Sequence, residues 1–134
     1  MKTISNSELI ARAASVIRSR RLGGFLVGDV GAALVTDKGI VHVGTCMDTS
    51  GLGICAEQSA IAAMLAAGED RVRKIVAVWK DEHGKLFVIS PCGHCRETMR
   101  QVCGATAKTE ILLSKTKAVK LEKLLPFRNS WTKV

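Results

Sequence analysis

The sequence predicts an α/β fold of three layers, in which helices flank both faces of a mixed five-stranded sheet. Helical and strand-forming patterns alternate along the chain in the order helix, two strands, helix, two strands, helix, strand, helix. This alternation is typical of a sheet with helices packed on its faces. The 134 residues contain no internal repeat, low-complexity tract or linker, so we expect residues 1–134 to form a single domain.

The composition fits one compact globular domain. Hydrophobic residues make up 47% of the chain and charged residues 24%, with only two prolines. A chain of this length buries roughly two-thirds of the surface that its unfolded form exposes, so it needs neither disulfides nor a structural metal to hold its core. A bound metal ion would therefore serve chemistry.

The sequence gives no sign of a membrane or secreted protein. The longest apolar runs, such as residues 61–67, are far shorter than the roughly 18 residues that span a bilayer. The first five residues carry one charge and then polar side chains, where a signal peptide needs an apolar core. We therefore expect a cytoplasmic protein, in which the five cysteines serve metal or thiol chemistry rather than disulfides.

The net charge of +8 is concentrated at the two ends of the chain. Residues 1–21 carry five basic residues against one acidic residue, and residues 108–134 carry seven against two. Basic segments can contact nucleic acid, but three Phe, two Trp and no Tyr provide few rings on which unpaired bases could stack. A solvated basic surface is favoured over a nucleic-acid partner.

The first predicted helix opens at a capping box, Ser5-Asn6-Ser7-Glu8. Apolar residues recur at helical spacing as far as Ile17, and we expect the helix to end near the basic cluster at residues 18–21. A hairpin should follow, because two β-prone runs, residues 30–36 and 39–43, flank an Asp-Lys-Gly turn signal.

The middle of the chain predicts a second helix and a second pair of strands. Residues 44–54 have no clear periodicity and should form a loop, whereas residues 56–67 are rich in Ala, Ile and Met and end at Gly68, a suitable C-cap. Residues 74–79 and 85–90 have the pattern of two further strands.

The last predicted elements are a helix, a strand and a short amphipathic segment. The helix covers residues 93–102, the strand residues 109–113, and the segment residues 119–125, which Pro126 stops.

Three cysteines stand at the starts of two predicted helices: Cys55 at one, and Cys92 and Cys95 at the other. Helix N-termini lower thiol pKa values and help to hold the thiolates that zinc requires. Because three protein ligands leave the fourth position of a tetrahedral ion open, the pattern favours a catalytic zinc site over a structural one.

Glu57 follows Cys55 at a helical offset that directs the two side chains apart. It is therefore better placed to transfer protons than to bind the same ion. A zinc-activated water needs a base to take its proton, and an amine leaving group needs a proton returned to it. The residues thus predict a hydrolytic deaminase.

These motifs resemble those of the cytidine deaminase superfamily. Cys-Ala-Glu at residues 55–57 and Pro-Cys-x-x-Cys at residues 91–95 resemble the zinc deaminase signature in its nucleoside branch, which has Cys where nucleic-acid and base deaminases have His. Val-Gly-Ala-Ala-Leu at residues 30–34, Ser-Pro-Cys-Gly-His-Cys-Arg at residues 90–96 and Leu-Leu-Pro at residues 124–126 extend the resemblance over most of the chain.

The resemblance implies one Zn²⁺ per subunit, bound by Cys55, Cys92 and Cys95. It also implies that hydroxide adds to C4 of a cytosine-type ring while Glu57 protonates N3. Glu57 then gives a proton to the departing amino group, which leaves a uracil-type ring and ammonia.

The charge of the zinc site is one point at which this chain departs from the family. Many cytidine deaminases have an arginine directly after the catalytic glutamate, where this chain has Gln58. Without that arginine, the negative charge of three thiolates on zinc needs another partner. His94 and Arg96, which flank Cys95, are the available replacements.

The substrate contacts depart from the family as well. Cytidine deaminases read ribose with an Asn and a Glu at positions that Cys46 and Asp48 occupy here. The loop before Cys55 has the length found in blasticidin-S deaminase, and Leu-Leu-Pro followed by Trp131 resembles the end of that enzyme. We expect substrate to contact the following residues: Cys46, Asp48, Ala56, Ser90 and Trp131.

Alternatives remain for some of these residues. Asp48 could equally cap its own loop, and Trp131 could be a core anchor or a pocket wall. The preferred substrate is cytidine or deoxycytidine, then a cytosine-containing nucleoside antibiotic, then another aminated heterocycle. The resemblance implies a homotetramer acting on small molecules, in pyrimidine salvage or in resistance. A nucleic-acid-binding or editing protein and a non-catalytic zinc module are the competing functions.

Overall fold

A computed structural model describes residues 3–102, 108–127 and 132–134 of the chain. Its elements follow in this order: α1 (Asn6–Ser15), β1 (Arg20–Leu22), β2 (Phe25–Thr36), β3 (Val41–Met47), α2 (Ala56–Ala66), β4 (Val72–Lys80), β5 (Leu86–Ile89), α3 (Gly93–Val102), β6 (Glu110–Leu112), β7 (Ala118–Lys120) and the 3-10 helix η2 (Leu121–Leu124). In this part of the chain no helix is long and apolar enough to cross a membrane.

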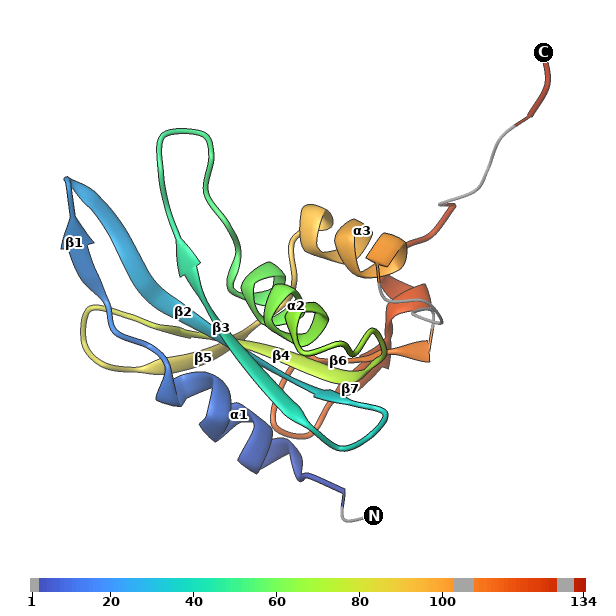
Figure 1. Ribbon diagram of the computed structural model, residues 1–134, viewed down its shortest axis with the longest axis horizontal. Helices are drawn as coiled ribbons and strands as arrows, with labels where there is room; N and C mark the ends of the chain where they lie inside the picture. The colour runs from blue at the N-terminus through green and yellow to red at the C-terminus, as the bar shows by residue number, and fades with distance from the viewer. Residues whose placement is uncertain (1–2, 103–107, 128–131) are drawn as a thin grey trace.

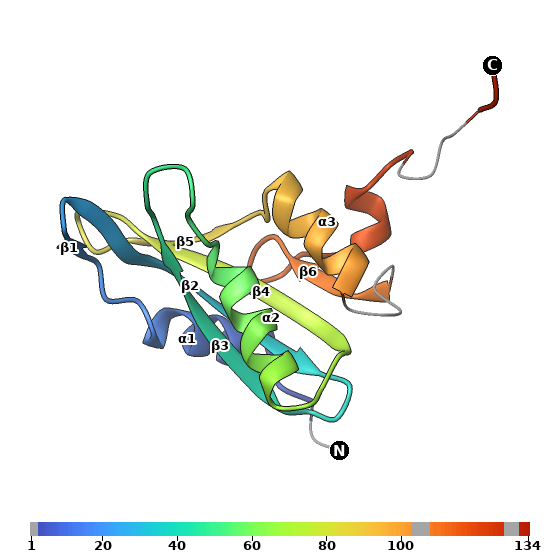
Figure 2. The ribbon, with the colours of Figure 1, turned by 45° about the horizontal axis from the view of Figure 1, so that its top comes forward.

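The strands form one mixed sheet in the order β1-β2-β4-β6-β7, with β3 also pairing with β2 and β5 also pairing with β4. The β4–β6 pair is parallel and the other pairs are antiparallel. Figures 1 and 2 show α2 and α3 on one side of this sheet and α1 on the other. The predicted three-layer fold with a mixed sheet is therefore confirmed.

Within the described residues the sheet has seven strands, where the sequence predicted five. Strand β2 starts at Phe25, five residues before the expected start, and its first residues pair with β1 (Arg20–Leu22). Helix α1 consequently ends at Ser15, ahead of the basic cluster that we expected to close it. Strand β7 (Ala118–Lys120) takes up the start of the segment predicted as amphipathic. Both extra strands are only three residues long and gain their stability from pairing, which no local pattern reveals.

The structure confirms the predicted start of α1 and the predicted turn between β2 and β3. The Ser5 side chain accepts a hydrogen bond of 3.1 Å from the backbone N–H of Glu8, which is the predicted cap of α1. Gly39 has a φ of 82°, so the β2–β3 turn uses a backbone conformation that glycine adopts without strain.

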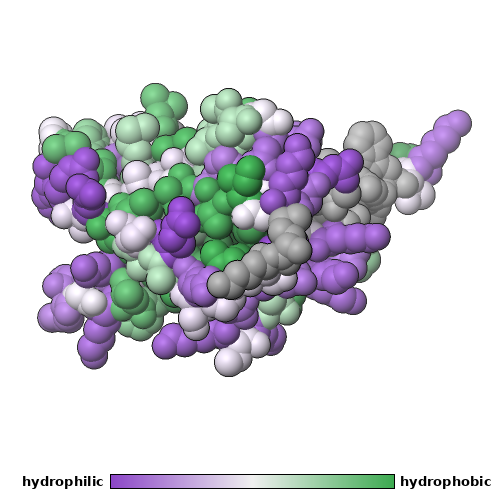
Figure 3. Space-filling view, turned by 60° about the horizontal axis from the view of Figure 1, so that its bottom comes forward, coloured by the Kyte–Doolittle hydropathy of each residue, from purple (hydrophilic) through white to green (hydrophobic). Residues whose placement is uncertain are grey.

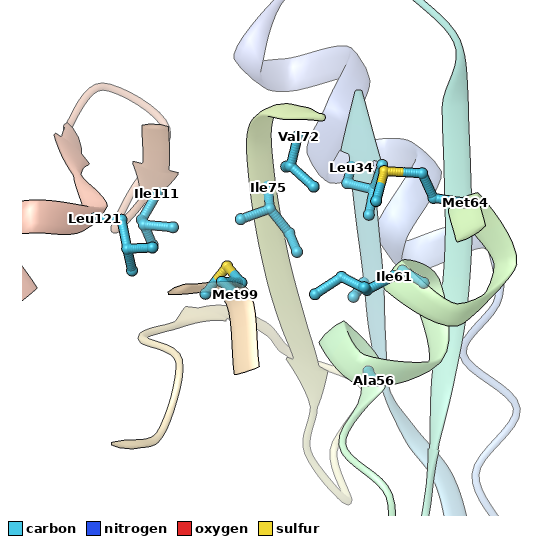
Figure 4. Packing of buried hydrophobic residues seen from close by; sticks show 11 residues of the cluster. Leu34, Ala56, Ile61, Met64, Val72, Ile75, Met99, Ile111 and Leu121 are labelled. Atoms are coloured by element: carbon cyan, nitrogen blue, oxygen red, sulfur yellow. The ribbon is translucent and has the colours of Figure 1, made fainter. Parts of the chain in front are cut away.

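Two hydrophobic layers hold the helices to the sheet. On one face Leu9 and Ala13 of α1 pack against alternate residues of β2 and β4, including Ala33 and Val76. On the other face, Figure 4 shows Ile61 and Met64 of α2 facing Leu34, Val72 and Ile75, with Met99 of α3 on the far side of Ile75 beside Ile111 and Leu121. Residues 31–36 of β2 are all buried because helices cover both faces of the strand.

A close contact between α2 and β3 sets the position of the first cysteine. A Cβ atom on Gly44 would lie 2.3 Å from the backbone nitrogen of Ala60 and 2.7 Å from the backbone oxygen of Ala56. Only glycine lets the strand approach the helix so closely. This contact fixes the N-terminal end of α2, where Cys55 and Glu57 lie.

The surface is mostly polar, but it carries exposed apolar side chains. Figure 3 shows one face on which hydrophobic residues gather between hydrophilic ones. At the β4–β5 end of the sheet Trp79, Leu86 and Phe87 are at least partly exposed, and the rings of Trp79 and Phe87 are 5.5 Å apart.

Candidate active site

The N-terminal ends of α2 and α3 bring the three predicted cysteines together. Cys55 is the N-cap residue of α2. The Cys92 carbonyl accepts a hydrogen bond of 3.0 Å from the backbone N–H of Arg96, so Cys92 directly precedes the first turn of α3. Cys95 lies in that first turn. The three Sγ atoms lie within 4.8 Å of one another, and those of Cys55 and Cys92 are 4.0 Å apart.

The spacing and chemistry of these sulfurs fit a zinc ion. With Zn–S bonds of about 2.3 Å, a tetrahedral ion separates its sulfur ligands by about 3.8 Å, close to the separations seen here. Three thiols form a soft donor set, and such a set binds zinc in preference to hard cations such as Mg²⁺. Within the described ranges this is the one group of three or more His, Cys, Asp or Glu side chains that could hold a metal ion.

The thiols of this cluster must lose their protons to bind a cation, and their surroundings shift their pKa values in different directions. Burial raises the pKa of Cys55 and of Cys95 above the usual thiol range. Burial acts on Cys92 in the same direction, but hydrogen bonds from the backbone N–H of Cys95, from neighbouring thiols and from the backbone of His94 lower its pKa overall. A divalent cation would stabilise all three thiolates, so metal binding and loss of protons are coupled here.

Glu57 lies beside the cysteines and is almost fully buried, with 6% of its surface exposed. Burial raises the pKa of its carboxyl group above the ordinary value, and its own backbone N–H offsets this only in part. A carboxyl group with a raised pKa takes up a proton more readily than an ordinary carboxylate, a property that general acid–base catalysis uses.

A pocket of about 400 Å³ opens onto Glu57 and the three cysteines. Four residues that the sequence predicted as substrate contacts line it: Cys46, Asp48, Ala56 and Ser90. The fifth, Trp131, lies outside the described residues. The volume suits a molecule of about the size of a nucleoside.

Asp29, which sequence reasoning missed, also lines the pocket. Its carboxylate accepts a hydrogen bond of 3.1 Å from the Cys46 thiol. The register of β2 against β3 shifts between Val27 and Gly31, and this β-bulge includes Asp29. The signal available was an acidic residue directly before an apolar strand, but the strand was expected to start only at Val30.

Gln58 connects the two helices that carry the cysteines. Its side-chain oxygen accepts a hydrogen bond of 3.1 Å from the Cys55 backbone N–H, while its Nε2 lies 3.0 Å from His94 Nε2 and 3.3 Å from Thr98 Oγ1. His94 therefore supports the site through Gln58, and no hydrogen bond joins its ring to a cysteine sulfur in the described part of the structure.

Arg96 holds the segment that leads into α3. Its guanidinium group donates to the Pro91 carbonyl at 2.8 Å, to Ser90 Oγ at 2.9 Å and to the Leu124 carbonyl at 3.3 Å. These bonds position the loop before Cys92 and the pocket residue Ser90. Arg96 therefore orders this loop, and its expected role toward the thiolate charge stays a prediction.

The whole arrangement matches known proteins. Residues 5–110 match the sequence model of the family described as "Cytidine and deoxycytidylate deaminase zinc-binding region". A cytidine deaminase of Mycobacterium tuberculosis is 35% identical over 78 residues, a stretch that spans 57% of this chain and 56% of that protein. The chain thus aligns with little more than half of the length of this relative.

Solved structures extend the likeness to nearly the whole chain. The crystal structure of a cytidine deaminase from Burkholderia pseudomallei is 29% identical with a TM-score of 0.72, covering 92% of this chain and 98% of that one. The crystal structure of the M. tuberculosis cytidine deaminase is 27% identical with a TM-score of 0.66, covering 91% of each chain. With the family's zinc-binding region matched over residues 5–110 and the three cysteines gathered beside Glu57, the chain belongs to the cytidine and deoxycytidylate deaminase family.

Proposed function

We propose that this protein is a zinc-dependent hydrolase that removes the exocyclic amino group from the cytosine ring of a nucleoside, cytidine or deoxycytidine. The observation that carries the proposal is one juxtaposition. Three thiols spaced for zinc lie beside a buried carboxyl group, and both face a pocket of about 400 Å³. Membership of the family and the names of its relatives support the same activity.

Cys55, Cys92 and Cys95 would hold the zinc ion and leave one coordination position free. When bound, zinc supplies Lewis-acid activation of water at neutral pH. The role of the protein is to fix three ligands from two helix ends, and Gln58 keeps those ends at a constant separation.

Glu57 would move the protons of the reaction. It accepts the proton that the attacking water loses and delivers it to N3 of the ring. It then takes the proton of the hydroxyl group that has added to C4 and gives it to the amino group, which departs as ammonia and leaves a uracil-type ring. Glu57 is buried, and this burial raises the pKa of its carboxyl group, which favours the uptake of a proton.

The remaining pocket residues would select the substrate. Ala56 and Ser90 line the pocket, as do Cys46 near the end of β3 and Asp48 directly after this strand, which extends to Met47 into the segment expected to be a loop. Because Cys46 and Asp48 differ from the residues expected in cytidine deaminases, a cytosine-containing antibiotic of the blasticidin-S type, or another aminated heterocycle, is the alternative substrate.

Ammonia release from zinc-loaded protein tests the activity. The panel contains cytidine, deoxycytidine, cytosine, blasticidin S and several aminopurines. Glu57→Gln should remove turnover and keep the zinc, whereas Glu122→Gln on the exposed 3-10 helix η2 serves as a matched control that stays active. Silence of the wild-type protein across the whole panel would contradict the proposal.

We also propose a cytoplasmic homotetramer that acts in pyrimidine salvage or in antibiotic resistance. The exposed side chains of Trp79, Leu86 and Phe87 offer apolar surface that a neighbouring subunit could cover. Light scattering on the purified protein measures the assembly, and a monomer at micromolar concentration would contradict a tetramer.

A further inference from the structure

Strand β3 (Val41–Met47) lies at one edge of the sheet and has an open side. In the described part of the chain it pairs with β2 alone, apart from one bridge between Met47 and Ile54 at its end. Successive residues of a strand direct their backbone N–H and C=O groups to opposite sides. About half of the backbone groups of β3 therefore point away from β2.

Hydrogen bonds at the two ends of β3 identify the residues whose groups point outward. The Ile40 carbonyl accepts from the Thr36 N–H at 2.9 Å, so even-numbered residues bond to β2. Met47 bonds to Ile54, outside the β2 ladder, through its N–H at 3.0 Å and its C=O at 2.8 Å. Both observations agree that the odd-numbered residues of β3 direct their backbone groups to the open side.

The open side has backbone groups to offer and nothing in the strand that blocks them. The outward N–H and C=O groups of Val41, Val43 and Thr45 have no hydrogen-bond partner within residues 3–102, 108–127 and 132–134. Such an edge pairs with another chain unless charged side chains, proline or a bulge prevent it. Residues 41–47 contain no Lys, Arg, Asp, Glu or Pro.

The strand at the other end of the sheet shows the protection that β3 lacks. Strand β7 (Ala118–Lys120) is three residues long, follows Lys117 directly and ends in Lys120. Short length and lysine side chains hinder the pairing of an edge with another chain. Strand β3 is seven residues long, so the two edges of the same sheet differ in what they can bind.

Helix α2 (Ala56–Ala66) adds an uncharged surface next to the open edge. It lies along β3 and β2 (Figure 2). Residues 58–68 contain no charged residue, and Ala62, Ala63, Leu65 and Ala66 are exposed. Because the chain has a net charge of +8, two copies repel one another unless they meet at an uncharged surface of this kind.

We propose that two copies of this chain pair through the open edges of β3, antiparallel and about a two-fold axis at Val43. This inference rests on the proposed assembly into an oligomer, of which it names one interface, and it does not depend on the deamination. With Val43 opposite its equivalent, Val41 lies opposite Thr45 of the partner subunit, and the outward groups form about six hydrogen bonds. All these side chains are β-branched, which suits cross-strand pairs.

The same axis brings the two α2 helices side by side. Antiparallel pairing about an axis perpendicular to the sheet keeps both helices on one face. Neighbouring strands are about 4.8 Å apart, and each α2 lies over β3 and β2, so the helix axes would be about 10 Å apart, a distance at which helices pack. The two pockets, which lie at the Met47 end of β3, would then be at opposite ends of the interface.

Disulfide cross-linking tests the register of the two strands. Val43→Cys places two thiols opposite each other at the axis, with Cα atoms about 5.5 Å apart, a separation that a disulfide spans. Thr45→Cys is the matched control, because two such residues would lie roughly 13 Å apart along the paired strands. Oxidised glutathione is the oxidant, and peptide mass spectrometry identifies the joined residues, which separates these bridges from those of native cysteines.

We expect at least about ten times more linked dimer from Val43→Cys than from Thr45→Cys. A mixture of Val41→Cys protein and Thr45→Cys protein should link the two kinds of chain to each other. Equal cross-linking of the two single variants, or no cross-link at Val43, would overturn the inference.

Sedimentation velocity measures the contribution of the edge to assembly. Val43→Pro removes an N–H that points away from β2, so the bonds to β2 remain, and edge strands tolerate proline. It should halve the size of the oligomer. Thr45→Lys, at an exposed position, should weaken assembly in the same way and stays informative if Val43→Pro impairs folding. Thr116→Lys, exposed in the turn before β7, is the matched control and should leave the oligomer intact.

The outcomes separate this inference from the proposed function. A tetramer that both β3 variants leave unchanged would refute this interface alone, and a wild-type protein that is monomeric at micromolar concentration would refute the interface and the tetramer together. Cross-linking at Val43 in a protein no larger than a dimer would support the interface and contradict the tetramer. Cross-linking at Val43 in a protein that releases no ammonia would support the interface while the deamination fails.

Discussion

Gln58 and His94 join the two helices that carry the zinc-site cysteines, with their Nε2 atoms 3.0 Å apart. Gln58 also accepts from the Cys55 backbone N–H at 3.1 Å. Because this oxygen is the acceptor, the amide nitrogen is the donor toward His94, whose Nε2 must then be unprotonated. The separation of the Cys55 and Cys92 sulfurs thus depends on a neutral hydrogen bond between two helix ends.

We expect Gln58→Ala to weaken zinc binding about tenfold, because residues that orient metal ligands typically contribute this much. Loss of the cap and of the link to α3 should also lower the free energy of unfolding by about 1–2 kcal/mol. Competition with a chromogenic chelator measures the first effect and thermal unfolding the second. Gln101→Ala is the matched control, because this exposed side chain donates to Glu97 of the same helix. Equal zinc affinities in the two variants would contradict the role of Gln58.

Met99→Ala should detach α3 from the core. Met99 is fully buried against Ile75 and its neighbours, and it is one of the two buried residues of the helix, the other being Cys95. The cavity should cost about 2–5 kcal/mol of unfolding free energy, and zinc should be retained less well because Cys95 belongs to the same helix. Met99→Leu keeps the volume and should cost less than about 1.5 kcal/mol. Chemical denaturation tests both, and equal midpoints would refute the anchoring role.

Gly44→Ala should destabilise the protein and reduce activity together. The added methyl group would meet backbone atoms of Ala56 and Ala60 at 2.7 and 2.3 Å, which pushes the N-terminal half of α2 away from β3. Overpacking of this kind costs about 1–3 kcal/mol, and the shift would move Cys55 and Glu57. Gly93→Ala is the control, because nothing lies within 4 Å of a Cβ atom there. If the Gly44→Ala protein had the same free energy of unfolding as the control, the close contact between β3 and α2 would not be needed for stability.

Acid should destabilise the protein in part through Glu69. Its carboxylate lies 2.8 Å from His42 Nε2, and hydrogen bonds from His42 and then from Thr36 hold its pKa below the ordinary value of 4.5. Since the folded pKa is the lower one, the stabilisation is complete above pH 4.5 and is lost as the pH falls through the folded value.

Glu69→Gln should therefore show a melting temperature that depends less on pH below 4.5 than that of the wild-type protein. Melting curves recorded between neutral pH and strongly acidic buffers make the comparison. Parallel curves for the two proteins would show that another group carries the acid sensitivity.

The alternation of elements and the chemistry of the site could be predicted from the amino-acid sequence. Ser5, the Asp-Lys-Gly turn and the strand patterns act through neighbours along the chain, so local physics was enough to place α1 to α3 and the main strands. Cys55, Cys92 and Cys95 were recognisable because thiols at the starts of helices suit a zinc ion, and the structure brings the three together. The resemblance to cytidine deaminases implied that Cys46 and Asp48 contact substrate, and both line the pocket.

The arrangement of these elements and side chains in space depends on contacts between segments that are distant in the sequence. The short strands β1 and β7 exist through pairing with β2 and β6, an interaction between segments whose own sequences do not specify it. The sequence singled out Arg96 by its place beside Cys95, but it did not reveal that this side chain donates to the loop before α3 and to Leu124. Asp29 reaches the pocket through a β-bulge and a thiol donor. Long-range packing fixes such contacts, because a side chain's partners depend on which distant segments the fold places beside it.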